Sequence, residues 1–163
     1  MNRLDFYTSI TPSTRQLEIQ SLRFYAFLHF GMNTFLDKEW SDGKASPSLF
    51  CPTQLDTDQW VRALRNAGMR GAILTAKHHD GFNLYPTKVT DHSVESSSWR
   101  DGKGDVVQEF VDSCTKYDMD IGFYLSPWDQ NLPSYPSNVA PDYNDTYIQP
   151  VSYTHLRAHE TLS

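Results

Sequence analysis

Three short apolar runs, separated by two amphipathic segments, constrain the fold of this sequence more than any other feature. The runs cover residues 24–30, 71–76 and 121–125, and their length and composition favour buried strands over helices. The segments between them, residues 56–68 and 105–117, carry apolar residues at helical spacing. A strand–helix–strand–helix–strand order with right-handed crossovers gives a parallel sheet. We therefore predict an α/β fold.

Both predicted helices carry recognisable end signals or a continuous apolar stripe. Asp56 or Thr57 can cap the first helix, and Gly68 can end it. The second helix is expected to bury Cys114 within its apolar stripe. The chain has 2 cysteines, which is too few for a disulfide framework or a zinc cluster.

The repeat length favours one kind of parallel architecture. The predicted strands begin near residues 24, 71 and 121, so each unit takes about 47–50 residues. Residues 29–34 lack the glycine-rich turn that a nucleotide-binding fold places after its first strand. Eight such units make a barrel of about 250 to over 400 residues. We predict the first three βα units of an incomplete (β/α)8 TIM barrel, with Phe27, Ile73 and Phe123 facing its inside.

Composition excludes several function classes. Lys plus Arg total 14 and Asp plus Glu total 20, which gives a net charge of −6 and no basic face for nucleic acid. No apolar run approaches the roughly 20 residues of a membrane helix. Residues 1–6 contain an arginine but no apolar core, so they do not predict a secretory signal. Localisation and oligomeric state stay open.

The last thirteen residues are predicted to lie outside the native fold. Residues 151–163 do not continue the apolar periodicity of the preceding chain, and we interpret them as a non-native tail. His155 and His159 have the i, i+4 spacing of a helical metal site, but they fall within this tail. The predicted organisation is therefore a barrel portion over residues 1–150 and a tail over residues 151–163.

Polar and aromatic residues follow each predicted strand, where parallel sheets place their functional groups. His29 ends the first strand, with Glu39 and Trp40 in the loop beyond it. The second strand runs directly into residues 77–80, which include two adjacent histidines, and Tyr124 closes the third. Imidazole can donate one hydrogen bond and accept another, so this mixture is typical of a sugar-binding site.

Two alternatives remain open on the residues alone. Three histidines and an aspartate could bind zinc in a metal-dependent barrel hydrolase. Against this, His78 and His79 are adjacent and would face opposite ways on a strand, so only a turn could aim both at one centre. A non-catalytic sugar-binding module is the other alternative. His92, in a polar loop, is expected at the surface.

Four motifs occur in an order that resembles the N-terminal part of the catalytic barrel of alpha-L-fucosidases, glycoside hydrolase family 29. They are Phe27-Leu28-His29-Phe30-Gly31, Glu39-Trp40-Ser41, Thr75-Ala76-Lys77-His78-His79-Asp80-Gly81-Phe82 and Gly122-Phe123-Tyr124-Leu125-Ser126-Pro127-Trp128-Asp129. The resemblance spans about residues 20–149. The last motif, followed by residues 143–145, is similar to the branch that acts on alpha-1,3/1,4-linked fucose.

The resemblance implies a fucose pocket, with a fucosylated oligosaccharide or glycoconjugate as substrate. We expect no cofactor, and no metal because the adjacent histidines are poorly placed for shared ligation and no cysteine cluster occurs. The residues that match fucose-contacting positions are His29, Glu39, Trp40, His78 and His79, with Tyr124 matching less closely. Members of that family hydrolyse fucosides with retention through two carboxylates, and they are extracellular, periplasmic or lysosomal. Both carboxylates are expected beyond residue 149 and neither Asp80 nor Asp129 matches the nucleophile, so this chain alone is expected to be inactive.

Overall fold

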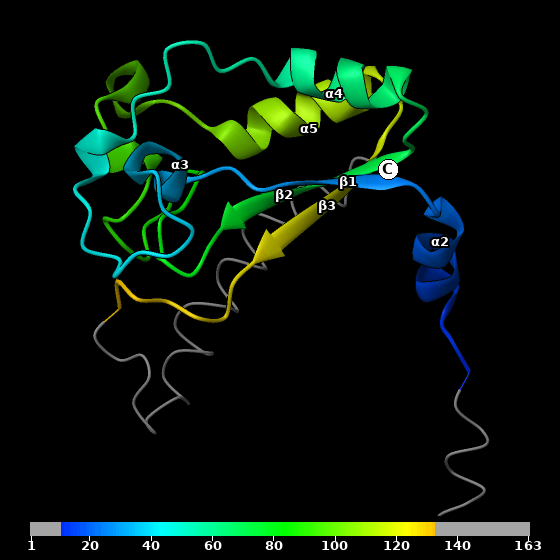
Figure 1. The fold of residues 1–163 in the computed structure, drawn as a ribbon, viewed down its shortest axis with the longest axis horizontal. Helices are drawn as coiled ribbons and strands as arrows, with labels where there is room; N and C mark the ends of the chain where they lie inside the picture. The colour runs from blue at the N-terminus through cyan, green and yellow to red at the C-terminus, as the bar shows by residue number, and fades with distance from the viewer. Residues whose placement is uncertain (1–10, 133–163) are drawn as a thin grey trace, which may run out of the picture.

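A three-stranded parallel sheet forms the centre of the computed structural model, which describes residues 11–132 (Figure 1). The strand order is β1 (Tyr25–Leu28), β2 (Gly71–Lys77), β3 (Asp120–Leu125), so each strand pairs with the one before it in the sequence. All three predicted strands are confirmed. Their carboxyl ends lie at one edge of the sheet, at the arrowheads in Figure 1.

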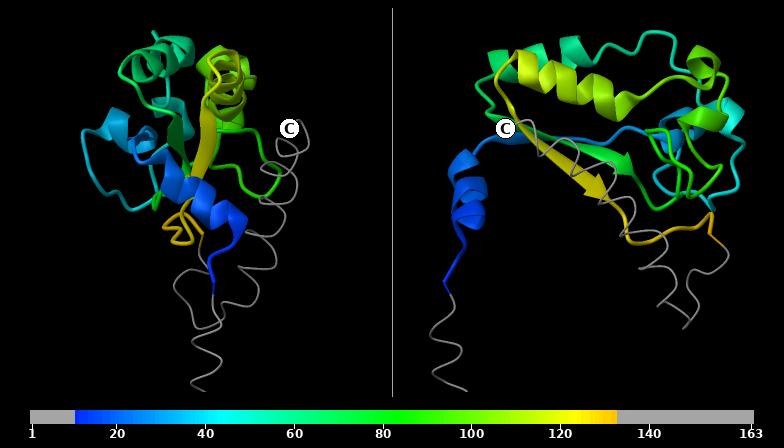
Figure 2. Two further views of the ribbon diagram at one scale, coloured as in Figure 1. Left: turned by 90° about the vertical axis from the view of Figure 1, so that its right-hand side faces the viewer. Right: turned by 180° about the vertical axis from the view of Figure 1, so that it is seen from behind.

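Two long helices, α4 (Thr57–Asn66) and α5 (Val106–Lys116), lie side by side on one face of the sheet (Figures 1 and 2). The carboxylate of Asp56 accepts the backbone N–H of Gln59 at 2.9 Å, which confirms the predicted cap. The stripe of α5 is fully packed, and burial raises the pKa of the Cys114 thiol to about 12. Both cysteines are free.

Short helices also lie before β1 and in the connections between the longer elements. They are α2 (Thr14–Leu22), α3 (Met32–Leu36), η1 (Pro47–Leu49), η2 (Val94–Ser96) and η3 (Trp99–Gly102). In Figure 1, α3 lies near the carboxyl edge of the sheet, whereas α2 lies at the opposite end of β1. No helix in the described part of the chain is long and apolar enough to cross a membrane.

The two faces of the sheet differ in what covers them. Phe123 was expected to point away from the helices, and this expectation is wrong: its ring packs on Phe110 of α5, with centroids 6.1 Å apart. Because side chains alternate along a strand, Tyr124 points to the other face. There its ring meets Phe27, at 5.8 Å, and Phe27 pairs with Ile73 across β1 and β2. Phe27 is 50% exposed on this face.

The apolar core extends from the helix layer into the connections after β1 and β2, so the loops that carry the site rest on packed side chains. Phe82 and Phe50 are buried here, with ring centroids 5.1 Å apart. His92 is only 4% exposed and packs edge-on against Phe82 at 5.2 Å, so its expected surface position is wrong. Burial lowers the pKa of His92.

Candidate functional site

The polar side chains that follow β1, β2 and β3 meet at the carboxyl edge of the sheet. His29 lies just after β1, and the run from His78 to Asp80 follows β2 without a gap. Ser126 comes directly after β3, and its backbone N–H donates to the Lys77 carbonyl at 3.0 Å. This bond continues the pairing of β2 with β3 into the turns, which fixes the two turns relative to each other.

Three histidines lie together at this edge. The ring of His78 lies between the other two, with its centroid 4.4 Å from His29 and 4.2 Å from His79. The strand alternation that would have separated His78 from His79 does not apply, because β2 ends at Lys77 and both histidines stand in a turn. A turn was the one arrangement expected to bring both histidines to the same centre, and a turn is what the structure has.

Aromatic rings extend the histidine cluster toward solvent. Trp40 lies 4.8 Å from His79 and 5.2 Å from Trp128, and its side chain is 51% exposed. Trp128 also contacts His79, at 5.1 Å. Tyr124 reaches the cluster from the sheet, with its ring 6.2 Å from His78 and 6.4 Å from His79. An apolar surface next to polar ring nitrogens suits a ligand with both C–H and O–H groups.

A cavity of about 390 Å³ opens beside His29 and His78. This volume lies in the usual range for small-molecule sites. Glu39 also lines the cavity, so the loop after α3 brings a carboxyl group to the histidines. Asn33, which the sequence analysis missed, is 8% exposed and donates from Nδ2 to the Glu39 carbonyl at 3.1 Å. Asn33 thereby holds the loop in place.

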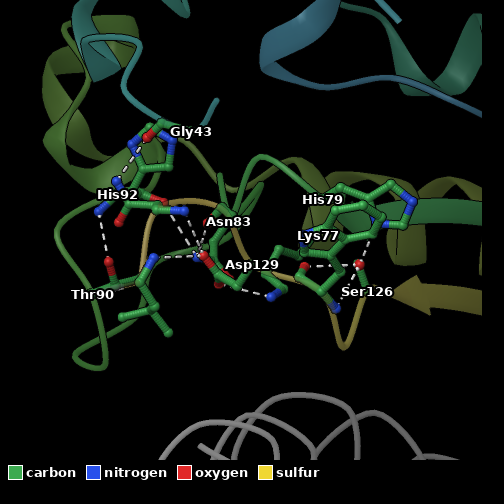
Figure 3. Close-up of polar contacts among 12 residues, drawn as sticks. Gly43, Lys77, His79, Asn83, Thr90, His92, Ser126 and Asp129 are labelled. Atoms are coloured by element: carbon green, nitrogen blue, oxygen red, sulfur yellow. Dashed lines mark hydrogen bonds and ion pairs between the residues drawn. The ribbon is translucent and has the colours of Figure 1, made fainter. Parts of the chain in front are cut away.

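Two buried carboxylates lie close to the site, and each is engaged in the fold. Oδ2 of Asp129 accepts from the Lys77 ammonium at 2.8 Å, and its Oδ1 accepts backbone N–H groups of Asn131 and Leu132, each at 3.0 Å (Figure 3). Asp80 accepts the N–H of Phe82 at 2.6 Å. Burial raises the pKa of Asp80, and the nearby Asp129 charge acts in the same direction. Burial lowers the pKa of Lys77, and there the Asp129 charge opposes the effect.

The histidines that follow β2 are uncharged at neutral pH. Burial, with smaller contributions from the neighbouring His79 and His29, lowers the pKa of His78 to about 4. Burial also lowers the pKa of His79, with smaller contributions from His29 and Lys77. A neutral imidazole has one donor and one acceptor nitrogen, so a histidine of this kind can donate a hydrogen bond to a hydroxyl group or accept one from it.

The six residues predicted for the site all lie at this edge of the sheet. Five are linked by ring contacts: His29, Trp40, His78, His79 and Tyr124. Glu39 joins them through the cavity. Whether each contacts a ligand stays a prediction. Within residues 11–132 no group of three or more His, Cys, Asp or Glu side chains is arranged to hold a metal ion.

The model of the alpha-L-fucosidase family matches residues 13–161 of this chain. The chain belongs to the alpha-L-fucosidase family. The resemblance predicted from its motifs is therefore confirmed. The match ends inside residues 151–163, and the prediction that this segment is non-native stays untested. That segment, with His155 and His159, and residues 143–145 lie outside the described part of the chain.

Similar proteins come from plants and bacteria. Alpha-L-fucosidase 1 of Arabidopsis thaliana is 48% identical over 137 residues, which cover 84% of this chain and 27% of the plant protein. A Bacteroides ovatus protein assigned as an alpha-L-fucosidase is 52% identical, with a TM-score of 0.82 over 86% of this chain and 24% of its own. A Ruminococcus gnavus family 29 fucosidase, solved with fucose, is 36% identical, with a TM-score of 0.76 over 87% of this chain and 32% of its own. The chain thus spans about a quarter of the length of the curated relative.

Proposed function

We propose that this chain forms the fucose-binding portion of an alpha-L-fucosidase, with β1, β2 and β3 as the first three strands of its (β/α)8 barrel. Family membership and the fucose complex of the Ruminococcus gnavus relative support this function. The helix layer that α4 and α5 form on one face of the sheet supports the barrel, because a barrel carries its helices outside and its packed side chains inside. The face opposite α4 and α5, with the half-exposed Phe27 and Tyr124, would be the inner wall.

The observation that carries the proposal is the convergence of three histidines, an exposed tryptophan and a carboxyl group on one edge. His29 and His78 bind sugar hydroxyls from the cavity wall, and Glu39 accepts hydroxyl protons. Trp40 presents a half-exposed ring against the C–H face of the sugar. His79 and Tyr124 complete the site between the cavity and the aromatic rings.

In the whole enzyme, the bond to fucose breaks with retention. One carboxylate attacks the sugar carbon and a second acts as acid and then base. Asp129 cannot serve as the nucleophile here, because it is buried against Lys77. Both groups belong to sequence beyond residue 149. The substrates we propose are glycans with terminal alpha-linked fucose.

Fucose titration of the chain, followed by tryptophan fluorescence, tests this proposal. L-Fucose should change the emission, because Trp40 and Trp128 border His79, whereas D-glucose should not. His29→Ala and Glu39→Ala should each weaken binding about tenfold, since each leaves a ligand hydroxyl without its partner. Glu95→Gln, at an exposed glutamate away from the site, serves as the control. If L-fucose changed the emission no more than D-glucose does, the proposal would be wrong.

A further inference from the structure

We propose that Ser126 is a positioning residue that holds His79 in the Nδ1–H tautomer, so that Nε2 of His79 accepts a hydrogen bond from a ligand hydroxyl. This inference rests on the proposed function and adds the direction of one hydrogen bond to it. Oγ of Ser126 lies 2.6 Å from Nδ1 of His79, although the two residues are 47 positions apart.

The backbone holds both residues in place before their side chains meet. Ser126 is completely buried, and its N–H donates to the Lys77 carbonyl at 3.0 Å. The carbonyl of His79 accepts the N–H of Gln130 at 2.9 Å. These two bonds join the turn after β2 to the turn after β3 on both sides of the side-chain contact. The distance between Oγ and Nδ1 is therefore set by the fold.

The direction of the hydrogen bond follows from counting protons on the serine hydroxyl. Oγ of Ser126 lies 2.9 Å from the carbonyl oxygen of Trp128, which can only accept, so the hydroxyl proton points there. The backbone N–H of Trp128 donates to the same Oγ at 3.1 Å. With its only proton engaged, Oγ must accept from His79, so Nδ1 carries a hydrogen (Figure 3).

The opposite arrangement leaves an unfavourable contact. If the hydroxyl of Ser126 donated to Nδ1 of His79, Oγ would face the Trp128 carbonyl at 2.9 Å with no hydrogen between two acceptors. Oγ is buried, so water cannot relieve this contact. The Nδ1–H tautomer satisfies all three groups around Ser126.

The tautomer decides what His79 offers to a ligand. Burial lowers the pKa of His79, so the ring is neutral at neutral pH and Nε2 carries a lone pair. No group among residues 11–132 hydrogen-bonds to this Nε2. Trp40 and Trp128 pack on the ring at 4.8 Å and 5.1 Å and restrict its rotation. His79 therefore presents a fixed acceptor, which selects a hydroxyl that can donate.

Nitrogen NMR of the full chain with ¹⁵N-labelled histidine tests the tautomer directly. The His79 signals are identified by their loss in His79→Gln. At neutral pH, Nδ1 should show the shift of a protonated ring nitrogen and Nε2 that of an unprotonated one. Ser126→Ala should move both shifts toward the average of two exchanging tautomers, and Ser126→Thr, which keeps the hydroxyl, should restore the original pattern.

Ser97→Ala is the matched control. Ser97 makes the same kind of backbone bonds, donating from Oγ to the Val94 carbonyl at 2.6 Å and accepting the Trp99 N–H at 3.2 Å, but it contacts no histidine. Its removal should leave the His79 spectrum unchanged. If Ser126→Ala also left the spectrum unchanged, Ser126 would be a turn residue only, and the inference would be wrong.

Fucose addition separates this inference from the proposed function. L-Fucose should shift Nε2 of His79 while Nδ1 stays protonated, and Ser126→Ala should bind fucose about fivefold more weakly. A proton on Nε2 in the unaltered chain overturns the inference even if fucose binds. The expected tautomer without any response to fucose overturns the proposed function and leaves the tautomer standing.

Discussion

Lys77 and Asp129 are 52 positions apart, yet Nζ and Oδ2 meet at 2.8 Å with both side chains buried. Lys77 ends β2 two residues before His79, and Asp129 directly follows Trp128. The ion pair therefore joins the two turns that carry the ring cluster. Its place in the fold also explains why neither residue is free to bind a ligand.

We expect Lys77→Met to destabilise the protein by about 3–5 kcal/mol, because it leaves the Asp129 carboxylate buried without its partner. Urea unfolding measures the loss. Lys116→Met is the control, since Lys116 pairs with Asp58 at 2.6 Å on the exposed surface of the helix layer. The control should lose much less. Similar losses for both variants would show that the buried pair does not anchor the turns.

Gly81 is expected to tolerate no side chain. Its φ is +83°, and a Cβ there would collide with Oδ1 of Asp129. Gly68 has a similar φ of +87° but open space around it. Gly68→Ala should therefore cost about 1 kcal/mol from backbone strain alone. Gly81→Ala should cost about 1–3 kcal/mol more, because crowding is added to the strain.

Chemical denaturation of the two alanine variants gives this difference directly. Because φ is nearly the same at the two glycines, the comparison isolates the collision with Asp129 and Asn131. Gly81→Ala should also reduce the fluorescence response to fucose, since it displaces the turn after β2. Equal unfolding free energies for the two variants would contradict the close approach of Gly81 to Asp129.

Stability should fall with acid in a way that depends on His78. The folded-state pKa of His78 is about 4, below the ordinary 6.5, because burial penalises the charged ring. As the pH falls below 6.5, the unfolded chain takes up this proton first. The stabilisation linked to His78 is therefore complete above pH 6.5 and is lost as the pH falls to about 4.

Thermal melting across this pH range, for the unaltered chain and for His78→Gln, measures the effect. Glutamine cannot take up the proton, so the variant should lose less stability between neutral and acidic pH. The remaining slope belongs to groups such as His79 and His92, whose pKa values are also lowered. Parallel melting profiles for the two proteins would contradict the burial of His78 as the cause.

The elements predicted correctly from the sequence are those with local signals. The Asp56 cap and the apolar stripe of α5 depend on residues within a few positions of one another, and both are confirmed. The predicted orientation of Phe123 was wrong. Residues 121–125 are apolar at nearly every position, so the sequence lacks the period-2 pattern that distinguishes the two faces of a strand. The orientation of Phe123 is set by the pairing of β3 with β2 and by packing on α5.

The sequence predicted that the site residues follow the ends of the strands, but it did not predict which side chains contact one another. Family motifs placed Glu39 and Trp40 beside the histidines, although nothing local indicates it. The contact between Ser126 and His79 spans 47 positions, and it exists only because β2 and β3 pair in one register. The burial of His92 was not predicted because it depends on packing against Phe82, ten positions away, whereas the residues next to His92 in the sequence are polar.

The sheet face that carries Phe27, opposite α4 and α5, should bind a hydrophobic dye. Phe27 is 50% exposed and contacts the ring of Tyr124, so the two form a continuous apolar surface. Phe27→Ser should remove most of the dye fluorescence, because it removes a half-exposed ring from this surface. Leu49→Ser is the control: Leu49 is 46% exposed but lies in η1, away from the sheet. Equal losses for the two variants would mean that the dye reports exposed apolar area in general and not this face.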